Sequence, residues 1–238
     1  MTVAIRERVC LIPGTMCDDR LWTPVQRHLS SDYQVAHVAI ESQPDRDAMH
    51  QLIASHTAVQ PCHLVGFSMG GYLALEHALS RQPRLRSLVL IATSAQGLTA
   101  QEQQSRAAML DWLSQHPYRG MSDKRLAEFV HAGQLSNPEV VSVVRAMDRQ
   151  LGQQTLLAQL RATTARTCLL DTMSRLTCPV LIIGAQDDLK VPQQDLWQMH
   201  QACPGSQLQI LPECGHMVPL ERPAQLAKLM EEFFKSCE

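Results

Sequence analysis

The chain has 238 residues, 45% of them hydrophobic, and its 21 Lys and Arg residues nearly balance 23 Asp and Glu residues. A chain of this length buries roughly 70 to 75% of the surface that it exposes when unfolded, which is enough for one large core. A net charge of −2 provides no broad positive field for polyanions, and no stretch reaches the roughly 18 apolar residues that a membrane helix needs. We therefore expect a cytoplasmic protein with no nucleic-acid partner and no membrane span, and the sequence leaves its oligomeric state open.

The strand signal consists of short runs rich in Val, Ile and Leu that recur between helical stretches. This pattern is typical of buried parallel strands connected by crossover helices, so the expected fold class is α/β. Amphipathic helices that cover the sheet are expected at Gly70–Ser80 and Ala224–Phe234. Strands are expected at Val9–Ile12, Gln34–Ala39, His63–Val65, Ser87–Ile91, Val180–Ile183 and Gln207–Leu211.

The strand signal disappears between Ala95 and Thr167, where Gln, Met, Ala and Leu become frequent. Turn signals such as Asn137-Pro138 divide this part into three or four helices, and their apolar faces require a partner. The prediction is a core domain formed by residues 1–94 and 168–238, with residues 95–167 inserted as a helical cap. Substrates would then enter beneath mobile helices. Trp112, Phe129 and Met147 are possible pocket walls in this cap, although the apolar faces of its helices are more typical of core.

Eight cysteines are scattered through the chain, at positions 10, 17, 62, 168, 178, 203, 214 and 237. A chain of this length does not need disulfides for stability, so we expect mostly buried, reduced thiols. None of them forms the Cys-x-x-Cys pair that begins most structural zinc sites. No metal is expected.

The strongest local motif is Val65-Gly66-Phe67-Ser68-Met69-Gly70-Gly71, a G-x-S-x-G sequence between a strand and a helix. In a nucleophile elbow the chain turns so sharply that the positions two residues before and after the serine must lack side chains. Gly66 and Gly70 meet this need, and the Met69 amide at the helix N-terminus is placed to stabilise an oxyanion. The alternative is a serine that merely caps the helix. The preceding strand favours the elbow, with Ser68 as nucleophile.

A serine nucleophile needs a base within hydrogen-bond reach and a third group that orients this base. His216 follows the last predicted strand, in Cys214-Gly215-His216-Met217, and is favoured over a mere loop histidine by its place in the chain. His63 lies within the strand that enters the elbow and His77 lies on the helix that leaves it. These two are expected to have packing or surface roles.

The acid should lie between the serine and the histidine in the chain, if the order Ser, Asp, His applies. The segment Pro179–Asp188 delivers two adjacent aspartates after a buried strand. Asp187 stands three residues beyond Gly184 and is the favoured partner of His216. Asp188 remains the alternative, because either aspartate could simply form a turn.

A second oxyanion donor should come from the loop after an early strand. Leu11-Ile12-Pro13-Gly14-Thr15-Met16 has this position. We expect the Thr15 amide to be the donor, with the Met16 amide second, whereas an ordinary Pro-Gly turn is the structural alternative.

With these segments placed, nearly the whole chain resembles the α/β-hydrolase superfamily, and within it the capped esterases, lactonases and carbon–carbon hydrolases. The resemblance implies an eight-stranded, mostly parallel sheet, a helical cap, no cofactor and an acyl-serine intermediate. Its three motif blocks stand in the family order: Ile12-Pro13-Gly14 through Trp22, Gly66 to Gly71, and Pro179 to Asp187 followed by Gly215-His216 through Glu221-Arg222-Pro223.

The chain departs from this family pattern at two places. Pro13-Gly14 stands where members usually carry His-Gly, so the hydrogen bonds that support this loop differ. The Gly-x-Gly-x-Ser segment of many members is missing from Ala39 to Asp47, so substrate contacts made there by other members do not transfer. Ser68 itself argues against dehalogenase and epoxide hydrolase activities, which use aspartate in similar folds.

The sequence thus predicts a serine hydrolase that cleaves a small ester, lactone or thioester, with a small-molecule acyl substrate as its partner. Two alternatives stay open at this point: a carbon–carbon bond hydrolase acting on a diketone-like substrate, and a catalytically silent ligand-binding protein. Acyl transfer to an alcohol or amine is less favoured. The identity of the substrate cannot be read from the residues.

Overall fold

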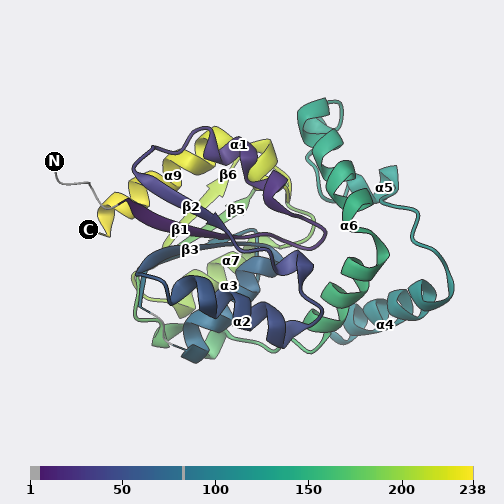
Figure 1. Ribbon diagram of the computed structural model, residues 1–238, viewed down its shortest axis with the longest axis horizontal. Coiled ribbons are helices and arrows are strands. Elements are labelled where there is room, and N and C mark those ends of the chain that lie inside the picture. The colour runs from purple at the N-terminus through teal and green to yellow at the C-terminus, as the bar shows by residue number, and fades with distance from the viewer. Residues whose placement is uncertain (1–5, 82–83, 238) are drawn as a thin grey trace.

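A single sheet of six parallel strands forms the centre of the molecule in the computed structural model, which describes residues 6–81 and 84–237 (Figure 1). The strand order is β2-β1-β3-β4-β5-β6, and every neighbouring pair is parallel. All six expected strands are confirmed, with small shifts of their ends. The strands are β1 Glu7–Ile12, β2 Tyr33–His37, β3 Cys62–Phe67, β4 Leu85–Ile91, β5 Val180–Ala185 and β6 Gln207–Leu211.

The expected count of eight strands is wrong for the described residues. The sheet has six strands within residues 6–81 and 84–237, and each connection between successive strands contains a helix. The parallel arrangement itself agrees with the α/β class predicted from the alternation of apolar runs and helical stretches.

Helices cover both faces of the sheet (Figure 1). On one face α1 Thr23–Gln26 and α9 Pro223–Ser236 pack, and on the other α2 Arg46–Thr57, α3 Met69–Arg81 and α7 Gln193–Ala202. The expected helices at Gly70–Ser80 and Ala224–Phe234 are thus confirmed as parts of α3 and α9. Shorter elements complete this part of the chain: η1 Asp19–Leu21, η2 Ile40–Ser42, η4 Leu170–Arg175 and α8 Val218–Glu221.

Alternate side chains of the strands divide the core into two layers. In β1, Val9 and Leu11 belong to the cluster beneath α1 and α9, whereas Cys10 and Ile12 belong to the cluster beneath α2, α3 and α7. Successive side chains of a strand point to opposite faces, and a sheet covered on both faces must be apolar on both. This is why strands inside the sheet such as β3 and β5 are buried along their whole length.

The chain between β4 and β5 is helical in the structure, as predicted, and extends beyond one end of the sheet (Figure 1). It contains α4 Ala100–Gln115, α5 Asp123–Leu126, η3 Ala132–Gln134 and α6 Pro138–Thr164. Helix α6 is interrupted at Gly152, whose φ of 67° lies outside the helical region. Helix α4 begins with a capping box between Thr99 and Glu102.

Five of the eight cysteines are buried, which agrees with the expectation that most of these thiols lie in the core: Cys10, Cys17, Cys62, Cys203 and Cys214. Within residues 6–81 and 84–237, no helix combines the length and the apolar character that crossing a bilayer requires.

Candidate active site

Ser68 lies at a sharp turn between the C-terminal end of β3 and the N-terminus of α3. Its φ of 51° is in the left-handed region that non-glycine residues rarely adopt. A side chain at position 66 would place its Cβ 2.5 Å from the Gly70 carbonyl oxygen, and one at position 70 would place its Cβ 2.3 Å from that of Pro13. The turn therefore requires both glycines, as the G-x-S-x-G spacing predicts, and it packs directly against the loop after β1.

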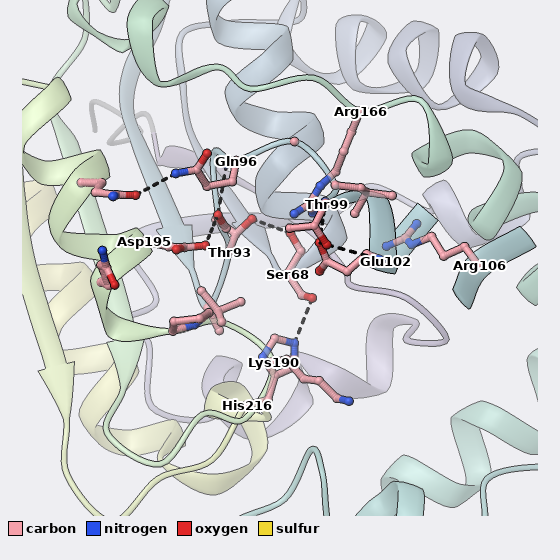
Figure 2. A pocket seen from close by; sticks show the side chains of 18 of the residues that line it. Ser68, Thr93, Gln96, Thr99, Glu102, Arg106, Arg166, Lys190, Asp195 and His216 are labelled. Atoms are coloured by element: carbon pink, nitrogen blue, oxygen red, sulfur yellow. Dashed lines mark hydrogen bonds between the residues drawn. The ribbon is translucent and has the colours of Figure 1, made fainter. Parts of the chain in front are cut away.

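His216 reaches Ser68 from the loop that follows β6. Its Nε2 lies 2.9 Å from the Ser68 Oγ (Figure 2), and the imidazole is only 3% exposed. The rings of Phe67 and Phe129 pack against it, with centroid distances of 5.2 and 5.7 Å. The expected juxtaposition of Ser68 and His216 is thus present, and the aromatic rings limit the access of water to this hydrogen bond.

Asp188, and not the favoured Asp187, is the carboxylate that contacts His216. The Asp188 Oδ2 lies 2.8 Å from the His216 Nδ1, and its side chain is 1% exposed. The other oxygen, Oδ1, accepts hydrogen bonds from the Lys190 and Val191 amides at 2.7 and 3.1 Å. Both oxygens are therefore held in place.

The expectation for Asp187 is wrong because the chain has not yet turned at this residue. Its amide still donates to the Cys214 carbonyl at 3.0 Å, in continuation of the pairing between β5 and β6. Its side chain is 44% exposed and lies 3.6 Å from the Nε2 of His131, away from His216. One further residue is needed to bring a carboxylate to the imidazole.

The structure distinguishes between the three backbone amides that are candidate oxyanion donors. The Met16 amide donates to the buried Oε1 of Gln159 at 2.9 Å and is therefore occupied. The Thr15 and Met69 amides donate no hydrogen bond to any residue that the structure describes. These two remain available for a substrate oxygen, so the preference for Thr15 over Met16 stays a prediction.

Comparison with known proteins places this arrangement in a family. A model described as the alpha/beta hydrolase family matches residues 11–229. The chain belongs to the alpha/beta hydrolase family. Its solved neighbours share the fold: an esterase of Thermogutta terrifontis with bound malate superposes with a TM-score of 0.86 at 22% identity, and covers 97% of this chain and 90% of its own.

Relatives of this alpha/beta hydrolase have different stated activities. An uncharacterized hydrolase of Bacillus subtilis is 26% identical over 77% of this chain and 68% of its own length. A pimeloyl-[acyl-carrier protein] methyl ester esterase of Aeromonas hydrophila is 25% identical over 73% of this chain and 70% of its own length. Across such relatives the match spans 55 to 78% of their own length. Their names do not define one substrate.

Glu221 supports the His216 loop, and the sequence patterns did not single it out for this task. Its buried carboxylate accepts hydrogen bonds from the amides of Gly215 at 3.1 Å, Met217 at 3.0 Å and His131 at 2.9 Å. Burial raises the pKa of Glu221 above its ordinary value, against these three donors, which favour the charged form. The carboxylate thus fixes both chain neighbours of His216 and attaches them to the segment between β4 and β5.

Ser68 and His216 open into a cavity of about 660 Å³ that is lined by both polar and apolar groups. Figure 2 shows Arg166, Glu102 and Arg106 on one side of Ser68, and Asp195 and Gln96 on the other. The searched part of the chain, residues 6–81 and 84–237, holds no group of three His, Cys, Asp or Glu side chains arranged to bind a metal ion.

The three possible pocket walls have different environments. Phe129 lines the cavity beside His216. Met147 is fully buried in the core cluster, whereas Trp112 is 49% exposed and stacks on His116 with a centroid distance of 5.0 Å. Met147 and Trp112 therefore do not line this cavity: Met147 packs into the core, as is more typical of these helices, and Trp112 is half-exposed to solvent. His63 and His77 are buried and hydrogen-bonded to Ser87 and Thr57, which agrees with packing roles.

Proposed function

We propose that the protein is a serine hydrolase that cleaves small carboxylic esters, lactones or thioesters through an acyl-serine intermediate. The observation that carries this proposal is the continuous chain of hydrogen bonds from Asp188 through His216 to Ser68, at 2.8 and 2.9 Å. Ser68 and His216 line a cavity, and the turn at Ser68 directs the N-terminus of α3 toward the serine. A merely structural histidine has no need of such an arrangement.

In the proposed reaction the Ser68 Oγ attacks the carbonyl carbon while its proton passes to the His216 Nε2. The amides of Met69 and Thr15 donate hydrogen bonds to the resulting oxyanion. The bond to the leaving group then breaks, and His216 returns the proton to the departing oxygen or sulfur. Water attacks the acyl-serine, gives a proton to His216, and releases the acid as that proton returns to Ser68.

Asp188 has a positioning role in this scheme. It accepts the Nδ1–H of His216, which leaves Nε2 unprotonated and ready to accept the serine proton. A buried carboxylate at this distance also stabilises the imidazolium that forms during the reaction. The helical segment between β4 and β5 acts as a cap that shapes the acyl pocket.

A carbon–carbon hydrolase is the second candidate. A 2-hydroxy-6-oxononadienedioate/2-hydroxy-6-oxononatrienedioate hydrolase of a Pseudomonas species is 25% identical over 74% of this chain and 63% of its own length. The same serine, histidine and aspartate could serve that reaction. A catalytically silent binding protein is disfavoured because nothing in ligand binding requires the three groups to be aligned.

The test combines labelling with turnover. A fluorophosphonate probe should label the wild-type protein and not Ser68→Ala, and a panel of p-nitrophenyl esters, lactones and aryl diketones identifies the bond that is cleaved. Ser68→Ala should lower kcat by about a millionfold while the melting temperature stays unchanged. Labelling that persists in Ser68→Ala would contradict the proposal, and turnover of the diketones alone would favour the second candidate.

A further inference from the structure

The cavity at Ser68 has a cationic wall that the proposed reaction does not use. Arg106 of α4, Arg166 after α6 and Lys190 after β5 all line it. Figure 2 shows Arg166 and Arg106 with Glu102 on one side of Ser68. A cavity that accepts only neutral acyl chains has no need of cationic groups, because each of them loses hydration there.

Arg166 is the least compensated of these cations. Its Nε is buried, and the side chain forms neither a hydrogen bond nor an ion pair with any described residue. The guanidinium lies over the ring of Tyr72, 5.3 Å from its centroid. Burial lowers the pKa of Arg166, yet a guanidinium keeps its charge at neutral pH. The charges of Glu102 and Asp195 act on Arg166 only through space, so the donors of its guanidinium are left for a ligand that binds it directly.

The backbone beside Arg166 is fixed. The Tyr72 hydroxyl donates to the Thr167 carbonyl at 2.9 Å and accepts from the Thr167 amide at 3.0 Å. Since Tyr72 lies on α3, one turn beyond Ser68, the position of Arg166 is tied to that of the serine. Groups held in this way lose little conformational entropy when a ligand binds.

Arg106 provides the second guanidinium. Its Nη1 donates to the Thr163 Oγ1 at 2.6 Å, and no carboxylate among the described residues forms an ion pair with it. Burial and the nearby charge of Arg166 both lower the pKa of Arg106. Glu102 acts electrostatically on both guanidiniums without forming an ion pair with either, so both would gain from an anion that binds them directly.

Each carboxylate that lines the cavity uses one oxygen to hold a neighbouring residue of the lining. Glu102 accepts from the Thr99 amide and hydroxyl, each at 2.8 Å, and Asp195 accepts from the Ser94 hydroxyl at 2.6 Å. Lys190 is bound to Glu128. With Lys190 paired to Glu128, the charges of Arg106 and Arg166 equal those of Glu102 and Asp195, and what remains open to a ligand is the set of guanidinium donors that no described residue accepts.

We infer that Arg166 and Arg106 bind a carboxylate of the substrate, so that the enzyme acts on acyl compounds with a free carboxylate, such as monoesters of dicarboxylic acids. This inference rests on the proposed function for the position of the scissile bond. The two guanidiniums would select and orient the substrate while Ser68, His216 and Asp188 perform the chemistry. A carboxylate fits the planar donors of a guanidinium in a bidentate manner.

Turnover of a matched pair of esters tests this inference. Mono-p-nitrophenyl glutarate carries the free carboxylate, and p-nitrophenyl pentanoate has the same acyl length without the charge. Arg166→Gln and Arg106→Gln should each cost the charged ester about ten- to a hundredfold more in kcat/KM than the neutral ester, mostly through KM. Arg166→Lys should recover part of this loss.

The control is Arg161→Gln, an exposed arginine in the last turn of α6 that does not line the cavity. It should leave the ratio of the two substrates unchanged. Equal losses for both esters in Arg166→Gln would overturn the inference, because the side chain would then serve only the fold.

A binding experiment separates this inference from the proposed function. Ser68→Ala should bind monomethyl glutarate in calorimetry, and the added Arg166→Gln change should raise the Kd about tenfold or more. An unchanged Kd overturns the anion site even if Ser68 proves to be the nucleophile. Conversely, ester hydrolysis that persists in Ser68→Ala overturns the proposed function, while the difference in Kd still supports the anion site.

Discussion

The exchange of Asp188 for Asn is the sharpest test of the triad. Both carboxylate oxygens of Asp188 are in use, Oδ2 by the His216 Nδ1 at 2.8 Å and Oδ1 by the amides of Lys190 and Val191. An asparagine keeps only one acceptor oxygen. If this oxygen accepts from the two amides, the NH₂ group of the asparagine faces the imidazole and donates to the His216 Nδ1. The imidazole proton then lies on Nε2.

An imidazole in this tautomer cannot accept the proton of Ser68. The loss expected from a wrong tautomer with intact geometry is about ten-thousandfold in kcat, which corresponds to about 5 kcal/mol of transition-state stabilisation. Asp187→Asn should change kcat by less than about threefold, because this half-exposed side chain does not contact His216 and lies 3.6 Å from His131.

Steady-state hydrolysis of p-nitrophenyl butyrate by the two variants and the wild type measures these effects. Thermal unfolding of each protein serves as control, since a collapsed loop would also remove activity. The reasoning is refuted if Asp187→Asn is the more impaired variant, or if Asp188→Asn retains more than about a tenth of the wild-type kcat with an unchanged melting temperature.

Three further changes test how the site is supported. Gln159→Leu removes the acceptor of the Met16 amide at 2.9 Å. It should lower kcat by up to about a hundredfold by displacing the loop after β1 that carries the proposed Thr15 donor, whereas Gln159→Glu should retain most activity. An unaffected kcat in Gln159→Leu would show that this loop keeps its position without Gln159. Glu221→Ala leaves three backbone amides without an acceptor and should lower the free energy of unfolding by about 2 to 4 kcal/mol in denaturant titrations. Glu221→Gln should have less effect. A loss below about 1 kcal/mol in Glu221→Ala would contradict the role of Glu221 in supporting the His216 loop. Phe129→Ala should shift the preference among p-nitrophenyl esters of rising chain length by roughly ten- to a hundredfold, because Phe129 lines the cavity. Met147→Ala should chiefly lower the melting temperature, because Met147 lies in the core. A uniform loss of activity across the esters in Phe129→Ala would show that this ring is not a pocket wall.

Local sequence patterns predicted the sheet and the elbow because these depend on the chain near the residues concerned. Continuous apolar runs predict the inner strands, since a strand covered on both faces is apolar throughout, whereas the edge strands β2 and β6 mix apolar with polar residues. Gly66 and Gly70 were predicted because the turn at Ser68 excludes a Cβ at both positions. In each case the requirement can be recognised without knowing what lies across the fold.

The choice between Asp187 and Asp188 could not be made in this way. The two aspartates are adjacent, and what separates them is whether the chain is still paired with the segment after β6. The Asp187 amide is still paired with the Cys214 carbonyl, whereas the Asp188 amide has no such partner among the described residues. Nothing in the sequence reports the residue at which this pairing ends.

The helical insertion shows the same limit. Its apolar periodicity predicted helices, but periodicity does not say which face another element covers. Leu113 is buried, whereas its neighbour Trp112 is half-exposed on the same helix. Arg106 and Arg166 carried no signal at all, because a single arginine in a polar segment is indistinguishable from a surface residue until its neighbours are known.

The connections between the insertion and the active site argue against a cap that opens as one rigid body. Gln159 accepts from the Met16 amide in the loop after β1, and the His131 amide donates to Glu221 beside the His216 loop. The Phe129 carbonyl also accepts from the Met217 amide at 3.2 Å. Opening the whole insertion would break all three hydrogen bonds and leave amides beside both loops without acceptors, at a cost of about 1 to 3 kcal/mol each. Since Ser68 and His216 depend on these loops for their alignment, an opening that broke the bonds would also disassemble the site. The movement that admits a substrate should therefore be confined to α4, while α6 and the 129–131 segment stay in place. The side chains of α4 are mostly exposed, and its hydrogen bonds to α6, from Arg106 to Thr163 and from Gln153 to the Leu113 carbonyl, support neither of the two loops.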